Sequence, residues 1–99
     1  GLSIKALFRA ALSQLPAARQ AAVHMMTKIC LKEHPDTASV VLCALKDSDW
    51  GVRREAALAC AVLASARDER IMQTLLHLLD DPEMHVRDTA KATLSALRV

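Results

Sequence analysis

The strongest constraint on the fold of this chain is an internal repeat with a period of 34 residues. The stretch from Leu45 to Leu63 returns, nearly position for position, from Leu79 to Leu97. A fixed period of this length indicates a stack of similar supersecondary units, because one unit alone cannot bury its apolar face. Such a stack offers a surface rather than a reaction centre, so the sequence predicts a binding scaffold. The matched positions are Leu45 with Leu79, Asp47 with Asp81, Val52-Arg53 with Val86-Arg87, Ala56 with Ala90 and Leu63 with Leu97.

The same offset, carried toward the amino terminus, finds a third and weaker copy. The apolar class is kept at its matched positions, and Arg19 matches the two later arginines. The acidic marker is lost, because Ser13 stands at the position of the two aspartates. Divergence of this kind is common in an outer unit of a stack. The sequence therefore predicts a single domain over residues 1–99, with units at approximately 2–33, 35–66 and 68–98.

Apolar residues at helical spacing predict two helices in each unit. In the first unit, Ile4, Leu7, Phe8 and Ala11 follow the pattern i, i+3, i+4 and i+7, which places them on one face of a helix. Ala, Leu and Val supply most of the packing, and only two glycines and three prolines interrupt the chain. Because the predicted loops are short, consecutive helices are expected to lie antiparallel and adjacent. The expected fold is all-α, with six antiparallel helices.

The starts of the second helices carry residues that favour helix initiation. Pro16 fits a first-turn position, where a missing N–H costs nothing. Ser48 or Asp49 is expected to cap the helix that starts near Trp50, and Asp81 is expected to cap the helix of the third unit. Trp50 itself has two interpretations. It packs over the helix start and covers the core between units, or it is an exposed anchor for a partner.

Charge and cysteine content narrow the class of protein. The net charge is +2, from 13 basic and 11 acidic residues, and the two signs interleave along the chain. This pattern is typical of a solvated surface rather than of a nucleic-acid footprint. Neither a signal peptide nor an uncharged apolar stretch long enough to cross a bilayer is found. The odd set of Cys30, Cys43 and Cys60 favours reduced thiols in an intracellular protein, in the cytoplasm or alternatively in the nucleus.

The two well-kept copies resemble the HEAT repeat. The resemblance rests on the pattern Leu-x-Asp-x4-Val-Arg-x2-Ala, which begins at Leu45 and again at Leu79. Its short Val-Arg-x-x-Ala form is similar to the compact subclass seen in phycobilin-lyase-like proteins. The resemblance implies an α-solenoid of three helical hairpins in a right-handed superhelical stack. It also implies that Asp47 pairs with Arg53, and Asp81 with Arg87, at the turns between helices.

The arginines of the second helices allow two interpretations. In the first, they are structural partners of the aspartates, since six residues separate each acid from its arginine across a turn where both can meet. In the second, they form a basic track for phosphates, and the chain is a nucleic-acid-binding solenoid. The sequence favours the structural interpretation. The arginines of the alternative are Arg19, Arg53, Arg54 and Arg87.

A catalytic, metal or cofactor site is not expected. The four histidines (His24, His34, His77 and His85) fall at unrelated points of the repeat. No HExxH, CxxC or paired Cys/His spacing for zinc occurs, and two glycines cannot build a phosphate-binding loop. The chain is therefore predicted to be a non-enzymatic protein–protein interaction scaffold that needs no cofactor.

The exposed side of the second helices is the predicted surface for a protein or peptide partner. Helical-wheel angles away from the apolar stripe select one small set of residues from each unit. The resulting surface is mixed and lightly charged, which suits a protein better than a nucleic-acid backbone. The candidate residues are Gln20, His24, Thr27, Arg54, Leu58, Asp88, Lys91 and Ser95.

The two ends of the chain suggest further contacts. Gly1 in place of methionine indicates a fragment of a longer repeat protein. The outer helices keep apolar residues and show no obvious polar capping helix. The expectation is that the ends meet further repeats of the parent chain or a second copy.

Overall fold

The computed structural model of this chain describes residues 3–29, 34–63 and 68–97. Within these ranges the fold is all-α, with six α-helices, one short 3₁₀ helix and no strand. Helix α5, which is the first helix of the third hairpin, continues directly into the 3₁₀ helix η1. The elements are α1 (Ile4–Ala10), α2 (Pro16–Lys28), α3 (Thr37–Leu45), α4 (Trp50–Leu63), α5 (Glu69–His77), η1 (Leu78–Asp80) and α6 (Met84–Leu97).

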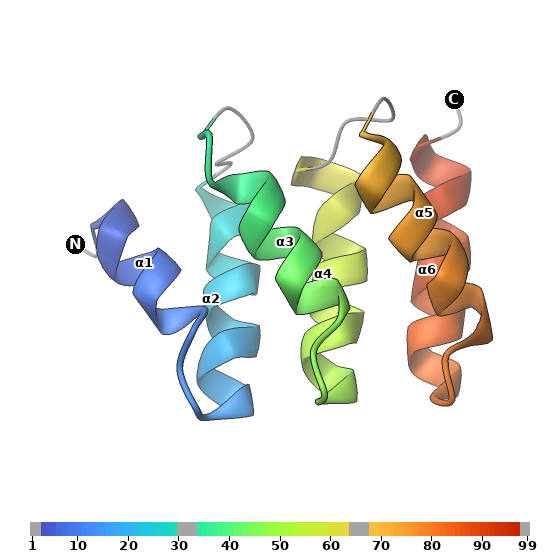
Figure 1. The fold of residues 1–99 in the computed structure, drawn as a ribbon, viewed down its shortest axis with the longest axis horizontal. Helices are drawn as coiled ribbons and strands as arrows, with labels where there is room; N and C mark the ends of the chain where they lie inside the picture. Colours follow the sequence, from blue (N-terminus) through green and yellow to red (C-terminus); the bar gives the residue numbers. More distant parts are fainter. Residues whose placement is uncertain (1–2, 30–33, 64–67, 98–99) are drawn as a thin grey trace.

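The six helices form a stack of three hairpins in two layers (Figure 1). Helices α2, α4 and α6 lie side by side in one layer, and α1, α3 and α5 lie across them in the other. The most extensive contacts join α2 to α4 and α4 to α6. The second helices of the three hairpins therefore make most of the contact between hairpins. The predicted helical hairpins are therefore confirmed. The unit boundaries expected at residues 33, 66 and 98 lie outside the described residues, and the handedness stays a prediction.

The core is centred on α4, which has a neighbouring hairpin on each side. Val52, Ala56, Ala57 and Cys60 of this helix have no exposed surface. Alanine at the contact lets the backbones of adjacent helices approach closely, and the buried hydroxyl of Thr93 on α6 donates to the carbonyl oxygen of Ala57 at 2.8 Å. Burial also raises the pKa of the Cys60 thiol to about 12, with a smaller contribution from the charge of Asp68. Cys60 is therefore a neutral packing residue, Cys43 is exposed, and Cys30 lies outside the described residues.

Of the three helix starts for which the sequence predicts a proline or a cap, two agree with the structure and one differs. Pro16 occupies the first turn of α2, as expected. The carboxylate of Asp49 accepts from the N–H of Val52 at 3.1 Å and caps α4. Asp81 does not cap α6, which begins at Met84; its Oδ1 accepts from the N–H of Glu83 in the preceding turn at 3.0 Å. The expected cap is wrong because this carboxylate faces the neighbouring hairpin.

Close packing at Ala56 gives a direct test of the core. Ala56→Leu should lower the free energy of unfolding by about 1–3 kcal/mol, because the added side chain overpacks a site with no free volume. Urea denaturation followed by circular dichroism measures the change. The control is Ala21→Leu on α2, which is exposed and should leave stability nearly unchanged. Equal stability of the two variants would show that the hairpins are not closely packed at Ala56.

Candidate functional site

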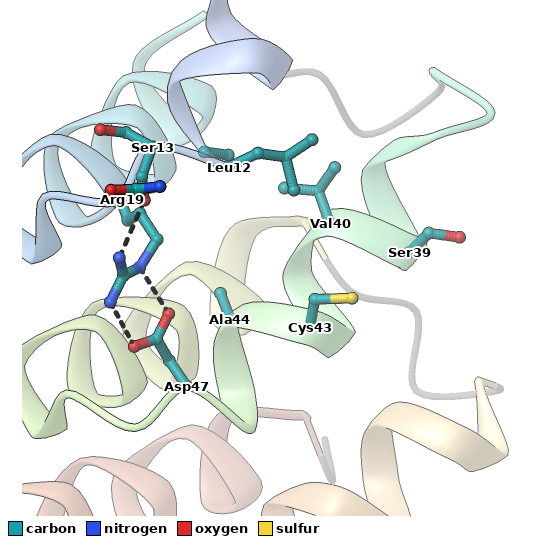
Figure 2. Close-up of a pocket in the computed structure, with 10 residues that line it drawn as sticks. Leu12, Ser13, Arg19, Ser39, Val40, Cys43, Ala44 and Asp47 are labelled. Carbon is teal, nitrogen blue, oxygen red and sulfur yellow. Dashed lines mark hydrogen bonds and ion pairs between the residues drawn. The ribbon is translucent and has the colours of Figure 1, made fainter.

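Two ion pairs connect neighbouring hairpins along one edge of the stack. The Nε and Nη2 atoms of Arg19 donate to Oδ2 and Oδ1 of Asp47 at 2.8 and 2.9 Å (Figure 2). Arg53 repeats this arrangement with Asp81 at 2.8 and 3.1 Å. In each pair the arginine comes from the second helix of one hairpin and the aspartate from the turn of the next. These bidentate pairs fix the offset between adjacent units.

Each of these arginines also holds the turn of its own hairpin. Nη1 of Arg19 donates to the carbonyl oxygen of Ser13 at 2.8 Å. Nη1 of Arg53 donates to the carbonyl of Asp47 at 2.9 Å, and Nη1 of Arg87 to that of Asp81 at 2.7 Å. One guanidinium therefore ties a turn to the hairpin that follows it. We call the row of Arg19, Arg53 and Arg87 with their acceptors the arginine ladder.

The pairing implied by the family resemblance is wrong. Asp47 does not pair with Arg53, nor Asp81 with Arg87, through their side chains. The arginine six residues after each aspartate reaches that residue's main-chain carbonyl instead. The carboxylate of Asp47 accepts from the N–H of Asp49 at 2.9 Å, which turns it toward the preceding hairpin and the guanidinium of Arg19. The structural interpretation of these residues holds, but their bonds run between units.

The ladder changes the acidity of both aspartates. Burial is the largest single effect and raises the pKa of each carboxyl, but the lowering effects together outweigh it, and the strongest of these are the hydrogen bonds from Arg19 to Asp47 and from Arg53 to Asp81. Backbone N–H donors and the nearby arginine charges act in the same direction, so both pKa values lie below the ordinary 3.8. The hydrogen bond with Asp47 also raises the pKa of Arg19. Both aspartates are therefore ionised at neutral pH.

These shifts predict a loss of stability in acid. A carboxyl whose pKa is lower in the folded chain stabilises the fold above the unfolded pKa, and the contribution disappears as pH falls through the folded pKa. We expect the free energy of unfolding to fall steeply below about pH 4. Asp81→Asn should be less stable at pH 7 and should flatten this profile, as measured by urea denaturation at several pH values. The neighbouring exposed Asp80→Asn is the control, and equal profiles for the two variants would contradict the role of Asp81.

The two ends of the ladder differ. Ser13 keeps the turn contact of the aspartates, since its Oγ accepts from the N–H of Leu15 at 3.1 Å, but it offers no carboxylate. At the other end Arg87 has its carbonyl acceptor, yet it forms no ion pair within the described ranges 3–29, 34–63 and 68–97. The carboxylate of Asp81 is occupied by Arg53. Within the described residues, the guanidinium of Arg87 therefore contacts the carbonyl of its own turn and no carboxylate.

This asymmetry predicts unequal effects of two matched substitutions. Arg53→Gln removes a bidentate bond to the nearly buried Asp81, and it should lower the free energy of unfolding by about 1–2 kcal/mol. Arg87→Gln removes only a bond to a carbonyl and should cost less. Thermal and urea denaturation of both variants measure the difference. A larger loss for Arg87→Gln would show that the bond to the turn, and not the pair between hairpins, carries the stability.

Between α4 and α6, two of the predicted partner residues line an open hollow of 290 Å³. Leu58 lies on its α4 side with 49% of its surface exposed, and Asp88 lies on its α6 side. The rest of the lining is small: Ala61, Thr89, Ala92, Thr93 and Ala96. This hollow joins an apolar floor to a polar margin, which is the composition of a protein-binding surface.

A second hollow of 320 Å³ lies between α2 and α4. Gln20 and His24 line it, and Nδ1 of His24 lies 3.3 Å from Oε2 of Glu55. Glu55 is nearly buried and was not among the predicted residues, because its side chain reaches α2 from the adjacent hairpin. Thr27 donates to the carbonyl of His24 at 2.6 Å. Arg54 is exposed on α4 and is not among the residues that line this hollow.

Lys91 and Ser95 line neither the hollow between α2 and α4 nor the hollow between α4 and α6. They line a third hollow of 210 Å³ with Leu76, Leu79 and Leu94, at the outer side of α6. The equivalent of Lys91 in the central hairpin is Ala57, which the next hairpin covers. Six of the eight predicted residues therefore line three hollows, and Thr27 and Arg54 line none of these three. Sequence periodicity alone could not show which of them share a hollow.

A further hollow, of 530 Å³, lies in the other layer and was not predicted (Figure 2). It opens between the α1–α2 turn and α3, with Leu12, Val40 and Cys43 on its walls and the Arg19–Asp47 pair at one side. Helix α3 packs against α5, whereas α1 packs chiefly against α2. The sequence signal for this opening was the divergence of the first unit, whose first helix α1 is shorter than α3 and α5.

Three further features concern Trp50, groups of metal-ligating side chains and membrane-spanning helices. Trp50 is 44% exposed at the start of α4, and its ring stacks on His85 of the next hairpin with centroids 5.5 Å apart, so it contacts the neighbouring unit. Over residues 3–29, 34–63 and 68–97, no three His, Cys, Asp or Glu side chains are grouped as a metal site. No helix in the same part of the chain has the length and apolarity needed to span a bilayer.

Comparison with known proteins supports the repeat. Residues 71–97 match the family model of the HEAT repeat, which covers α6 and most of α5. No curated protein and no solved structure matches the chain. The third hairpin is therefore a HEAT repeat, and the first two hairpins repeat its architecture and its ladder.

Proposed function

We propose that this chain is a non-enzymatic scaffold that binds a protein or peptide on the surface of its second helices. The observation that carries the proposal is the pair of open hollows between α2 and α4 and between α4 and α6, with exposed Leu58 on α4. HEAT repeats are typical of interaction scaffolds, and the grooves between their parallel second helices suit an extended segment or a helix. The partner would place an apolar side chain beside Leu58 and polar groups near Gln20, His24, Arg54 and Asp88.

The alternative, a nucleic-acid-binding solenoid, has less support. Of its four arginines, Arg19 and Arg53 already hold carboxylates. Of the four, only Arg54 on α4 and Arg87 on α6 remain for phosphates. Few phosphate contacts give weak binding, because affinity and its salt dependence both grow with the number of phosphates that the protein neutralises. A protein partner therefore fits the described surface better.

Two finer assignments accompany this proposal. The short form of the repeat supports placing the chain in the compact, phycobilin-lyase-like subclass. Reduced thiols and interleaved charges support an intracellular, cytoplasmic location, with the nucleus as the alternative. Both follow from sequence patterns.

The proposal is tested by one substitution in the surface and one outside it. Leu58→Glu should reduce capture of a bound protein from a cell extract by at least about tenfold, because it places a charge at the centre of the apolar hollow. Stability should change little, since Leu58 is half exposed. Capture is measured by quantitative mass spectrometry against the unmodified chain.

Gln73→Glu on α5 is the matched control, because Gln73 is exposed in the other helix layer. It should retain the captured protein. Equal capture by Leu58→Glu and the unmodified chain would contradict the proposed surface. Retention of nucleic acid that disappears with moderate salt and with Arg54→Gln would instead favour the alternative.

A further inference from the structure

The hollow between α2 and α4 contains a charged group that the repeat does not require. Glu55 of α4 has 8% of its surface exposed, and it lines this hollow together with Gln20 and His24 of α2. The equivalent positions, one repeat earlier and one repeat later, are Ala21 and Thr89. The other two hairpins therefore form without a carboxylate at this place, and the packing of the helices gives no reason for one.

The carboxylate of Glu55 is only partly compensated. Within the described residues, the one side-chain donor that reaches it is Nδ1 of His24, which lies 3.3 Å from Oε2. A neutral imidazole supplies a single donor and no full charge, whereas a carboxylate accepts several hydrogen bonds through its two oxygens. Removal of a carboxylate from water costs free energy unless a cation or several donors compensate it. Glu55 therefore keeps unused acceptor capacity at the hollow, which a cation from outside the stack would fill.

The neighbouring hollow of the same surface also has an acidic margin. Asp88 of α6 is exposed and lines the hollow between α4 and α6. Among the described residues that line either hollow there is no Lys or Arg, and the exposed Arg54 of α4 lies outside both linings. Carboxylates in both hollows attract a basic partner and repel an acidic one or a phosphate backbone.

An exposed apolar residue lies close to Glu55 on the same helix. Leu58 follows Glu55 by three residues, a rise of about 4.5 Å along α4. It is 49% exposed and lines the neighbouring hollow, where Ala61 is the other residue from α4. Helices α2, α4 and α6 lie side by side (Figure 1). One segment that crosses α4 would therefore reach both hollows, with a cation in the first and an apolar side chain in the second.

We propose that the hollow between α2 and α4 is the binding site for an arginine or lysine of the partner protein. The cation would donate to the Glu55 carboxylate, and the side-chain oxygen of Gln20 offers a further acceptor in the same hollow. An aliphatic residue of the same segment would lie beside Leu58. This inference rests on the proposed function and adds the chemistry of the partner, which is a basic and aliphatic peptide segment.

The test begins with peptide selection on the full chain. The probe is a phage-displayed library of random peptides of about 12 residues, long enough to cross two adjacent helices. Peptides enriched on the unmodified chain should carry Arg or Lys near an aliphatic residue. Selection on Glu55→Gln should lose the excess of Arg and Lys. Glu69→Gln is the matched control, because Glu69 is exposed on α5 in the other helix layer, and it should keep that excess.

A thermodynamic cycle then tests the contact itself. The selected peptide is compared with a copy in which citrulline replaces arginine, or acetyllysine replaces lysine, so that only the charge is removed. Fluorescence anisotropy should show that this change weakens binding to the unmodified chain about tenfold or more and weakens binding to Glu55→Gln much less. Circular dichroism verifies that each variant remains folded. A general loss of fold would lower the affinity of both peptides equally.

The outcomes separate this inference from the proposed function. Selected peptides without an excess of Arg and Lys, no selected peptide at all, or equal binding of the charged and uncharged copies would overturn the cation site. If the peptides still lose affinity in Leu58→Gln, which removes the apolar group without adding charge, the surface of the second helices stands and the cation site alone falls. Peptides that bind Leu58→Gln as tightly as the unmodified chain would contradict both.

Discussion

The bridging arginine is the interaction that sets the relation between hairpins in this stack. One nitrogen of each guanidinium donates a hydrogen bond to the carbonyl of its own turn. In Arg19 and Arg53, two further nitrogens donate to a carboxylate of the next hairpin. Apolar contacts between helices tolerate sliding, because dispersion and burial have little directionality. A planar guanidinium that must donate to two carboxylate oxygens at once does not tolerate such sliding. The register of neighbouring hairpins therefore depends on these bonds.

Packing in the second-helix layer acts together with this polar edge. Ala56, Ala57 and Cys60 on α4 are small, and they bring α2, α4 and α6 close enough for Thr93 to bond a carbonyl of α4. This close approach leaves two open hollows along the second-helix layer, one between α2 and α4 and one between α4 and α6.

The sequence predicted the fold well because the fold repeats. The 34-residue period and the apolar stripes located the helices, the second-helix core and the residues that form the ladder. The direction of the ladder could not be predicted, because a spacing of six residues between Asp47 and Arg53 does not tell whether a long side chain reaches back to a carboxylate or to a carbonyl. The candidate site was predicted only in part. Helical-wheel angles placed Leu58 and Lys91 together, whereas Leu58 lines the hollow between α4 and α6 and Lys91 lines another hollow with Leu76, Leu79 and Leu94.

The opening beside α1 has a practical consequence for chemical biology. Cys43 is exposed on the wall of this 530 Å³ hollow, and the Arg19–Asp47 pair forms part of the same wall. Cys60 is shielded in the core, with a thiol that stays protonated. A thiol-directed fragment tethered at Cys43 would sit against the junction of the first two hairpins. Such a compound would act as a wedge on that joint, and its attachment would make the coupling between neighbouring repeats accessible to small-molecule control.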